Sequence, residues 1–203
     1  MGFLDAFRRK PPIRDMAELA EFVAGNAAFL VQKGIYEYSR ARAGHYAKVL
    51  FREQSFLDAV EVARWRAYPL GLAMVAEIVD GVLREGGPGR LQGQAAFAAC
   101  VLDTFDRYPA PVALGAEGWS ALRADLERRL RLITLHPPKR AMDVSEPFAQ
   151  AYFDLMPIHE KLRGRDLLTT RNYLRVTLCN IHEEFSRRVD KSAVAAALSL
   201  EPA

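Results

Sequence analysis

The sequence predicts an all-α protein: a single compact helical bundle of about six to eight helices with a short N-terminal amphipathic extension. Three observations predict this class. Apolar residues recur at helical spacing along most of the chain, no segment alternates apolar and polar residues as a half-buried strand would, and no period of 20 to 50 residues repeats. The chain has 203 residues, half of them hydrophobic, which is enough to bury one core. We expect residues 1–12 to form the extension and residues 13–203 the helical domain.

The first helical pattern begins after Asp15, which is a favourable N-cap residue. It covers residues 16–31, and Gly34 then interrupts it. A second pattern continues over residues 35–51, with a weak point at Gly44. Glycine disfavours helix interiors, so we expect two helices here.

The next helix follows a sequence at Ser55 that resembles a capping box. Pro69 must break or kink this helix, or begin a new one, because proline lacks an amide hydrogen and clashes with the preceding turn. Residues 70–83 then carry only two charges, Glu77 and Asp80. A helix that is apolar over most of its circumference is predicted to be central and largely surrounded.

Further helical patterns follow a glycine-rich loop at residues 86–89. Prolines end two of them, one at Pro109 and the other at Pro137. Leucine and aromatic residues at helical spacing give each an apolar face. In the last long helix this stripe consists of Leu174, Leu178, Ile181 and Phe185, at positions i, i+4, i+7 and i+11. These helices are expected over residues 91–108 and about 119–133, over a short stretch capped by Ser145, and over residues 167–189 and 193–200.

The charge balance argues against a dedicated nucleic-acid binder. The net charge is only +3, and acidic residues are interleaved with the 28 basic ones, whereas nucleic-acid binders usually concentrate uncompensated charge on one face. Two cysteines without CxxC spacing predict neither a disulfide framework nor a zinc site. No apolar stretch reaches bilayer length and no secretory signal is evident, so the expected location is cytoplasmic.

The stretch CNIHEEF, residues 179–185, concentrates a thiol, an imidazole and two carboxylates. Glu183 and Glu184 each face an arginine four residues later, which is a favourable helical pairing. The chain lacks the Glu-x-x-His motif of helical di-metal proteins. We therefore predict ordinary helix surface, with no metal and no cofactor. The alternative is a metal-dependent oxidase or oxygenase that uses His159, Glu160, His182 and Glu183.

A second candidate site combines aromatic and basic residues from two segments. Arginine binds carboxylate or phosphate in two-pronged fashion, and aromatic rings supply an apolar wall, so together they suit an anionic or amphipathic ligand. If the two helices pack as a hairpin, these groups could line one pocket. The candidate ligand-binding residues are Tyr38, Arg42, His45, Tyr46, Trp65, Arg66 and Tyr68. The alternative is a set of half-buried aromatic residues with stacked arginines.

The third candidate is the N-terminus, MGFLDAFRRKPP. An apolar side of a short helix is followed at once by three basic residues, and two prolines stiffen the joint to the domain. This pattern suits an anionic membrane surface or a groove on a partner protein. The candidate membrane- or partner-binding residues are Phe3, Leu4, Phe7, Arg8, Arg9 and Lys10. The alternative is that this segment folds back and covers part of the core.

Together these features favour a non-catalytic interaction or accessory protein, an adaptor or assembly factor. It is expected to bind a protein partner in the cytoplasm, with a possible peripheral position at the inner membrane surface. The alternative is a helical carrier or enzyme that holds a small anionic or amphipathic ligand between helices. The chain has no GxSxG, HExxH or phosphate-loop motif to assign a specific enzymatic reaction.

Overall fold

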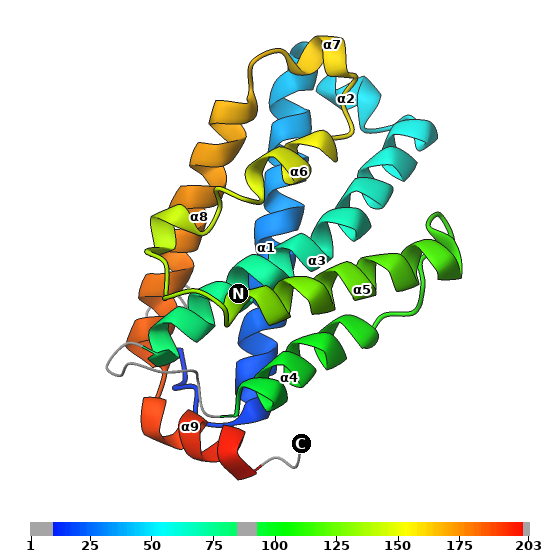
Figure 1. Ribbon diagram of the computed structural model, residues 1–203. Helices are drawn as coiled ribbons and strands as arrows, with labels where there is room; N and C mark the ends of the chain where they lie inside the picture. Colours follow the sequence, from blue (N-terminus) through cyan, green and yellow to red (C-terminus); the bar gives the residue numbers. More distant parts are fainter. Residues whose placement is uncertain (1–9, 85–92, 201–203) are drawn as a thin grey trace.

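The computed structural model describes residues 10–84 and 93–200, and it confirms the all-α class (Figure 1). Within these two ranges the only β-type pairing is an isolated bridge between Ile13 and Val189. In the part of the chain that the structure describes, no helix is both long and apolar enough to cross a bilayer.

The first helix, α1, spans Met16–Ala43 without interruption. The predicted break at Gly34 is therefore wrong, whereas the weak point predicted at Gly44 is confirmed, because α1 ends there. Asp15 caps α1 as expected, since its Oδ1 accepts a hydrogen bond from the Glu18 amide at 2.8 Å. The chain turns at Gly44, where φ is 52°, into the short helices η2 (Gly44–Tyr46) and α2 (Ala47–Leu50).

Helix α3 spans Gln54–Arg84 and is the centre of the molecule. Every residue from Ala67 to Val82 is buried, which confirms the surrounded helix predicted from the apolar run. Pro69 does not end this helix, contrary to one prediction. A proline inside a helix costs about 3 kcal/mol. Burial of the apolar residues on both sides of Pro69 offsets that cost and keeps the helix continuous.

The remaining helices follow the predicted order. The short helix expected to be capped at Ser145 begins instead after Phe148, because residues 145–148 form a turn. In the last long helix the predicted stripe of Leu174, Leu178, Ile181 and Phe185 is buried, as expected. The bounds are α4 Gln94–Asp106, α5 Gly115–Ile133, η3 Ala141–Asp143, α6 Ala149–Asp154, α7 Glu160–Arg163, α8 Leu167–Arg188 and α9 Lys191–Leu200.

Two directions organise the bundle (Figure 1). Helices α1 and α8 run along its long axis, while α4 and α5 extend to one side. Helix α3 contacts α1, α4, α5 and α8, so its apolar residues meet a neighbour on every side. This arrangement leaves the aromatic residues of α3 between α1 and the end of α4.

A strap of residues 10–14 ties the start of the chain to the end of α8. Ile13 is fully buried, donates to the Arg188 carbonyl at 2.9 Å and accepts from the Asp190 amide at 2.9 Å. Lys10 forms an ion pair with Glu184 at 2.9 Å. Lys10, which the sequence assigned to the extension, therefore contacts the domain.

Candidate binding site

The structure does not bring the predicted ligand-binding residues to one place. Tyr38 donates a hydrogen bond to Asp166 Oδ2 at 3.0 Å, and Arg42 forms an ion pair with the same carboxylate. Arg42 also donates to the Arg163 carbonyl at 3.2 Å. These contacts fix the loop between α7 and α8 against α1, so Tyr38 and Arg42 have a structural role.

His45 and Tyr46 lie at the turn between α1 and α2. Tyr46 is 78% exposed, and His45 borders a shallow hollow with Arg40 and Lys48. Arg66 is exposed on α3. None of these three residues borders the cavity that holds the other two predicted residues, Trp65 and Tyr68.

Trp65 and Tyr68 line a pocket of about 360 Å³ between α1 and α3, beside the end of α4. We call it the aromatic pocket. Its wall on α1 is made by small and polar side chains, and its wall on α3 by rings and one arginine. The lining residues are Ala28, Val31, Gln32, Arg64, Trp65, Tyr68 and Tyr108.

A cluster of five aromatic rings holds the walls of this pocket in place. Trp65 meets Tyr108 and Trp119 edge-on, with ring centroids 5.4 and 5.7 Å apart. Behind them Phe105 stacks on Trp119 at 4.1 Å. Such contacts add about 0.5–1.5 kcal/mol per pair beyond burial. The wall is thus preorganised, and Trp65, Tyr68 and Tyr108 reach the cavity.

Two exposed polar side chains border the same cavity, and a buried hydroxyl lies close by. Arg64 and Gln32 are exposed at its rim. The Tyr68 hydroxyl is buried and makes no hydrogen bond of normal geometry with any residue in the described ranges. Burial, with a smaller contribution from the adjacent Tyr108, raises the pKa of Tyr68, so this hydroxyl stays protonated and is a hydrogen-bond donor at neutral pH.

The sequence identified two of these residues and missed Gln32, Arg64 and Tyr108. A signal was present for one of them, because Arg64 is four residues before Tyr68 and therefore lies on the same helix face. Arg66 is two residues before Tyr68 and points elsewhere. Gln32 and Tyr108 come from other helices, and no local pattern indicates that they approach α3.

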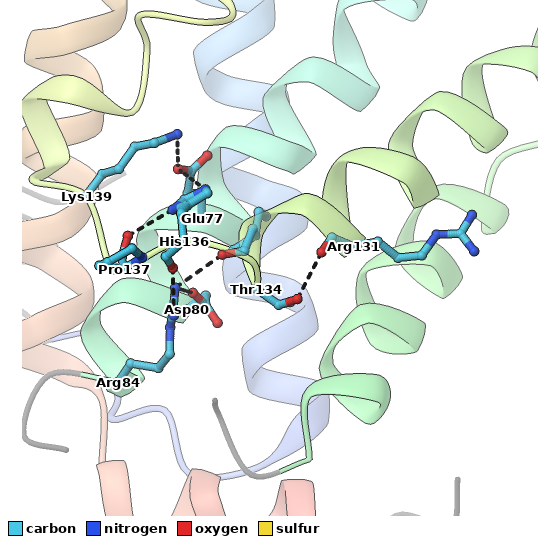
Figure 2. A network of polar contacts seen from close by, with 9 residues as sticks. Glu77, Asp80, Arg84, Arg131, Thr134, His136, Pro137 and Lys139 are labelled. Atoms are coloured by element: carbon cyan, nitrogen blue, oxygen red, sulfur yellow. Dashed lines mark hydrogen bonds and ion pairs between the residues drawn. The ribbon is translucent and has the colours of Figure 1, made fainter. Parts of the chain in front are cut away.

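A buried group of charges lies elsewhere, around the C-terminal half of α3 (Figure 2). Glu77 receives Lys139 at 2.7 Å and His136 Nε2 at 3.6 Å. Arg84 pairs with Asp80 at 2.5 Å and donates to the His136 carbonyl at 3.1 Å. We call these five residues the buried ionic cluster. The sequence marked Glu77 and Asp80 as the only charges in an apolar helix but did not predict this cluster.

The buried ionic cluster has a structural role. The Glu77 and Asp80 side chains are 5% and 1% exposed, respectively. Glu77 pairs with Lys139 and Asp80 with Arg84, so both carboxylates have their main partners within the cluster. Burial raises the pKa of Asp80, and the pairing with Arg84 only partly opposes this effect. Removing one partner of a buried ion pair destabilises the folded protein, because the other charge stays buried and unpaired. The cluster therefore holds the loop after α5 against α3.

The CNIHEEF stretch lies on the C-terminal half of α8. Glu184 pairs with Arg188 at 2.6 Å, as predicted. Burial alone would raise the pKa of Glu184, but hydrogen bonds from Lys10 and Arg188 outweigh it and lower this pKa.

The four residues of the metal alternative do not meet. His159 is the N-cap of α7, and its Nδ1 accepts from the Lys161 amide at 3.2 Å. His182 lies about 22 Å along the axis of α8 from Leu167, at about 1.5 Å per residue. Over residues 10–84 and 93–200, no group of three His, Cys, Asp or Glu side chains is placed to hold a metal ion.

A larger groove of about 650 Å³ lies between the N-terminal strap and α1. Its apolar side includes Phe22 and the exposed Phe29. Its charged groups are already paired within the protein: Glu184 with Lys10 and Arg188, and Glu21 with Arg107 at 2.6 Å. The aromatic pocket therefore offers more unsatisfied polar groups to a ligand than this groove does.

No family model, curated protein or solved structure matches the chain. We therefore derive the function from the aromatic pocket itself.

Proposed function

We propose that this chain is a non-catalytic interaction protein, an adaptor or assembly factor, and that it holds its partner at the aromatic pocket. The observation behind the proposal is an open cavity that carries Trp65, Tyr68, Tyr108 and an arginine at its rim. Tryptophan, tyrosine and arginine are the residue types that dominate the binding energy of protein interfaces.

The architecture suits an anchor site. Trp65 and Tyr108 rest on buried rings, so they lose little conformational freedom when a partner binds. Tyr108 is 40% exposed, so its ring is available on the surface. One apolar side chain of a partner, inserted between α1 and α3, would be surrounded by these rings.

The second candidate function is a carrier of a small amphipathic ligand in the same pocket. It is favoured by the volume of about 360 Å³, because small-molecule sites usually measure about 300–1,000 Å³. The two candidates predict different bound species, and one experiment separates them.

The experiment is photo-crosslinking in cells with benzoylphenylalanine in place of Gln32, which lines the pocket. The matched control carries the same group in place of Arg131, whose side chain is 70% exposed on α5. We expect a protein-sized adduct at position 32 that Tyr108→Ala abolishes. An adduct of small-molecule mass would favour the carrier. Equal labelling from position 131, or labelling that survives Tyr108→Ala, would contradict both.

A position at the inner membrane surface is part of the same proposal, and it depends on the N-terminus. Phe3, Leu4, Phe7, Arg8 and Arg9 lie outside the described residues. Each basic residue near an anionic surface contributes about 1 kcal/mol. We expect the full-length chain to sediment with phosphatidylglycerol vesicles and a variant without residues 2–9 to stay in solution. Equal sedimentation of the two would remove the membrane from the proposal.

Lys10, the last of the candidate membrane- or partner-binding residues, lies within the described part of the chain and pairs with Glu184. This ion pair competes with any contact between Lys10 and a membrane surface.

A further inference from the structure

We propose that the aromatic pocket selects a flat apolar group that carries a carboxylate, with Arg64 binding the carboxylate and the three rings enclosing the apolar part. This inference rests on the proposed function and specifies the ligand chemistry of the same site.

The first observation is the state of Arg64. Two arginines near the aromatic cluster are engaged: Arg107, next to Tyr108, pairs with Glu21 at 2.6 Å, and Arg123 on α5 pairs with Asp106 at 2.7 Å. Arg64 borders the cavity, and within residues 10–84 and 93–200 no carboxylate pairs with it. A guanidinium at the rim of an aromatic cavity is suited to two-pronged binding of a carboxylate.

The second observation is the donor set around the cavity. Arg64 and Gln32 are the exposed polar side chains that border it, whereas the Tyr68 hydroxyl is buried. The guanidinium of Arg64 and the amide of Gln32 can both donate, and an anionic oxygen can accept from each. Hydrogen bonds to a charged group are roughly twice as strong as neutral ones. A carboxylate ligand therefore forms stronger hydrogen bonds with the donors at the rim of the pocket than a neutral amide does.

The third observation decides the sign of the ligand charge. Aromatic faces alone would also attract a cation. The charge on Arg64 opposes a cation, and the nearby Glu21 is neutralised by Arg107. The pocket therefore favours an anion, with the rings packing against its apolar body.

Two sources can supply this chemistry. The carboxylate and the flat group can belong to a free aryl acid, or to an acidic residue next to an aromatic residue in a partner segment. Two probes distinguish them: 2-naphthoate represents the free acid, and N-acetyl-aspartyl-tryptophan amide represents the segment. Tighter binding of the dipeptide identifies a partner segment, and tighter binding of naphthoate identifies a small acid.

The test is isothermal titration of the full chain with three probes that share one ring system. These are 2-naphthoate, the neutral 2-naphthamide and the cationic 2-naphthylmethylammonium. We expect naphthoate to bind about five- to tenfold more tightly than naphthamide, since one charge-assisted contact is gained. The cation should bind most weakly of the three.

Arg64 and Arg66 supply a matched pair of variants. Both are exposed on α3, but only Arg64 borders the pocket. Arg64→Gln should weaken naphthoate about five- to tenfold and leave naphthamide unchanged, whereas Arg66→Gln should change neither.

The outcomes separate this inference from the proposed function. If all three probes bind equally, or if Arg66→Gln weakens naphthoate as much as Arg64→Gln does, the charge selection is wrong and the pocket remains a binding site. If no probe binds while the crosslinked adduct at position 32 still forms, only the inference is overturned. If no probe binds and no adduct forms, the proposed function is overturned as well.

Discussion

Two glycines of α1 have opposite surroundings. A Cβ atom on Gly34 would lie 2.4 Å from the Tyr152 hydroxyl and 2.6 Å from a ring carbon of Tyr173. Tyr173 donates to the Leu30 carbonyl at 2.9 Å, so both tyrosines pack directly on the backbone of α1. A Cβ atom on Gly25 would meet nothing within 4 Å. Gly34 is thus required by packing, and Gly25 is not.

This contrast predicts opposite effects of one substitution. Gly34→Ala should destabilise the protein by about 1–3 kcal/mol, because the two tyrosines must move. Gly25→Ala, the control in the same helix, should stabilise it by about 0.5–1 kcal/mol by lowering the entropy of the unfolded chain. Urea denaturation measures both. Equal effects of the two substitutions would show that Tyr152 and Tyr173 do not pack as described.

Asp80 predicts a dependence of stability on pH. Burial raises the pKa of Asp80 in the folded state above its ordinary value near 3.8. The folded state then holds the proton more tightly, so the contribution of Asp80 to stability is full below 3.8 and falls as pH rises to the raised pKa. A pKa difference of one corresponds to about 1.4 kcal/mol.

The comparison with Asp80→Asn separates this effect from that of carboxylates outside the buried ionic cluster, because these contribute equally to both proteins. The free energy of unfolding of the variant minus that of the wild type should increase as pH rises above 3.8. Urea titrations at several pH values test it. A difference that decreases with pH would mean that Arg84 lowers the pKa of Asp80.

At the scale of elements, the loop after α5 depends on ionic contacts with α3. The loop supplies His136 and Lys139, and α3 supplies Glu77. The adjacent Arg140 pairs with Asp143 at the surface, where its side chain is 75% exposed. Lys139 and Arg140 therefore differ in the burial of the carboxylate that each one pairs with, which is 5% exposed for Lys139 and 40% exposed for Arg140.

Lys139→Met should cost about 1–2 kcal/mol, since it leaves a buried carboxylate with only a distant imidazole and the lysine itself is partly exposed. Arg140→Met should change stability by less than about 0.5 kcal/mol. Adding Glu77→Met to Lys139→Met should recover most of the loss, because the unpaired charge is removed. Thermal denaturation compares the variants. No recovery in the double variant would show that packing, not charge, causes the loss.

The N-terminal strap is the second element whose energetics can be tested. Ile13 is fully buried, so Ile13→Ala should cost about 2–5 kcal/mol. Deletion of residues 2–9 keeps the contacts of Lys10 and Ile13 described above and should shift the melting temperature by less than about 2 °C. A large drop on deletion would instead support the alternative that this segment covers the core.

The sequence predicted the helix features that local residues determine, such as caps and apolar faces. It did not predict the continuity of helices that depends on packing. Asp15 and the stripe from Leu174 to Phe185 are local signals, and both were confirmed. The continuity of α1 through Gly34 and of α3 through Pro69 depends on neighbouring helices. Propensity opposes both, and only the burial of residues on each side explains why the helices continue.

At the scale of the whole molecule, the bundle brings together residues that are distant in sequence. The all-α class and the central position of α3 followed from hydrophobic periodicity. The aromatic pocket could not be predicted in full, because Gln32, Trp65 and Tyr108 meet only when α1, α3 and the end of α4 are packed. The predicted site mixed two of its residues with Tyr38 and Arg42, which the fold directs to Asp166.

The most direct test of the account is an NMR titration that follows the two indole N–H signals. The chain has only two tryptophans: Trp65 lines the pocket and Trp119, which is 8% exposed, lies behind it. With 2-naphthoate added, we expect a saturable shift of the Trp65 signal and a smaller one of Trp119, both abolished by Tyr108→Ala. Unmoved indole signals, or shifts that persist in Tyr108→Ala, would contradict the claim that the aromatic pocket binds an aryl carboxylate.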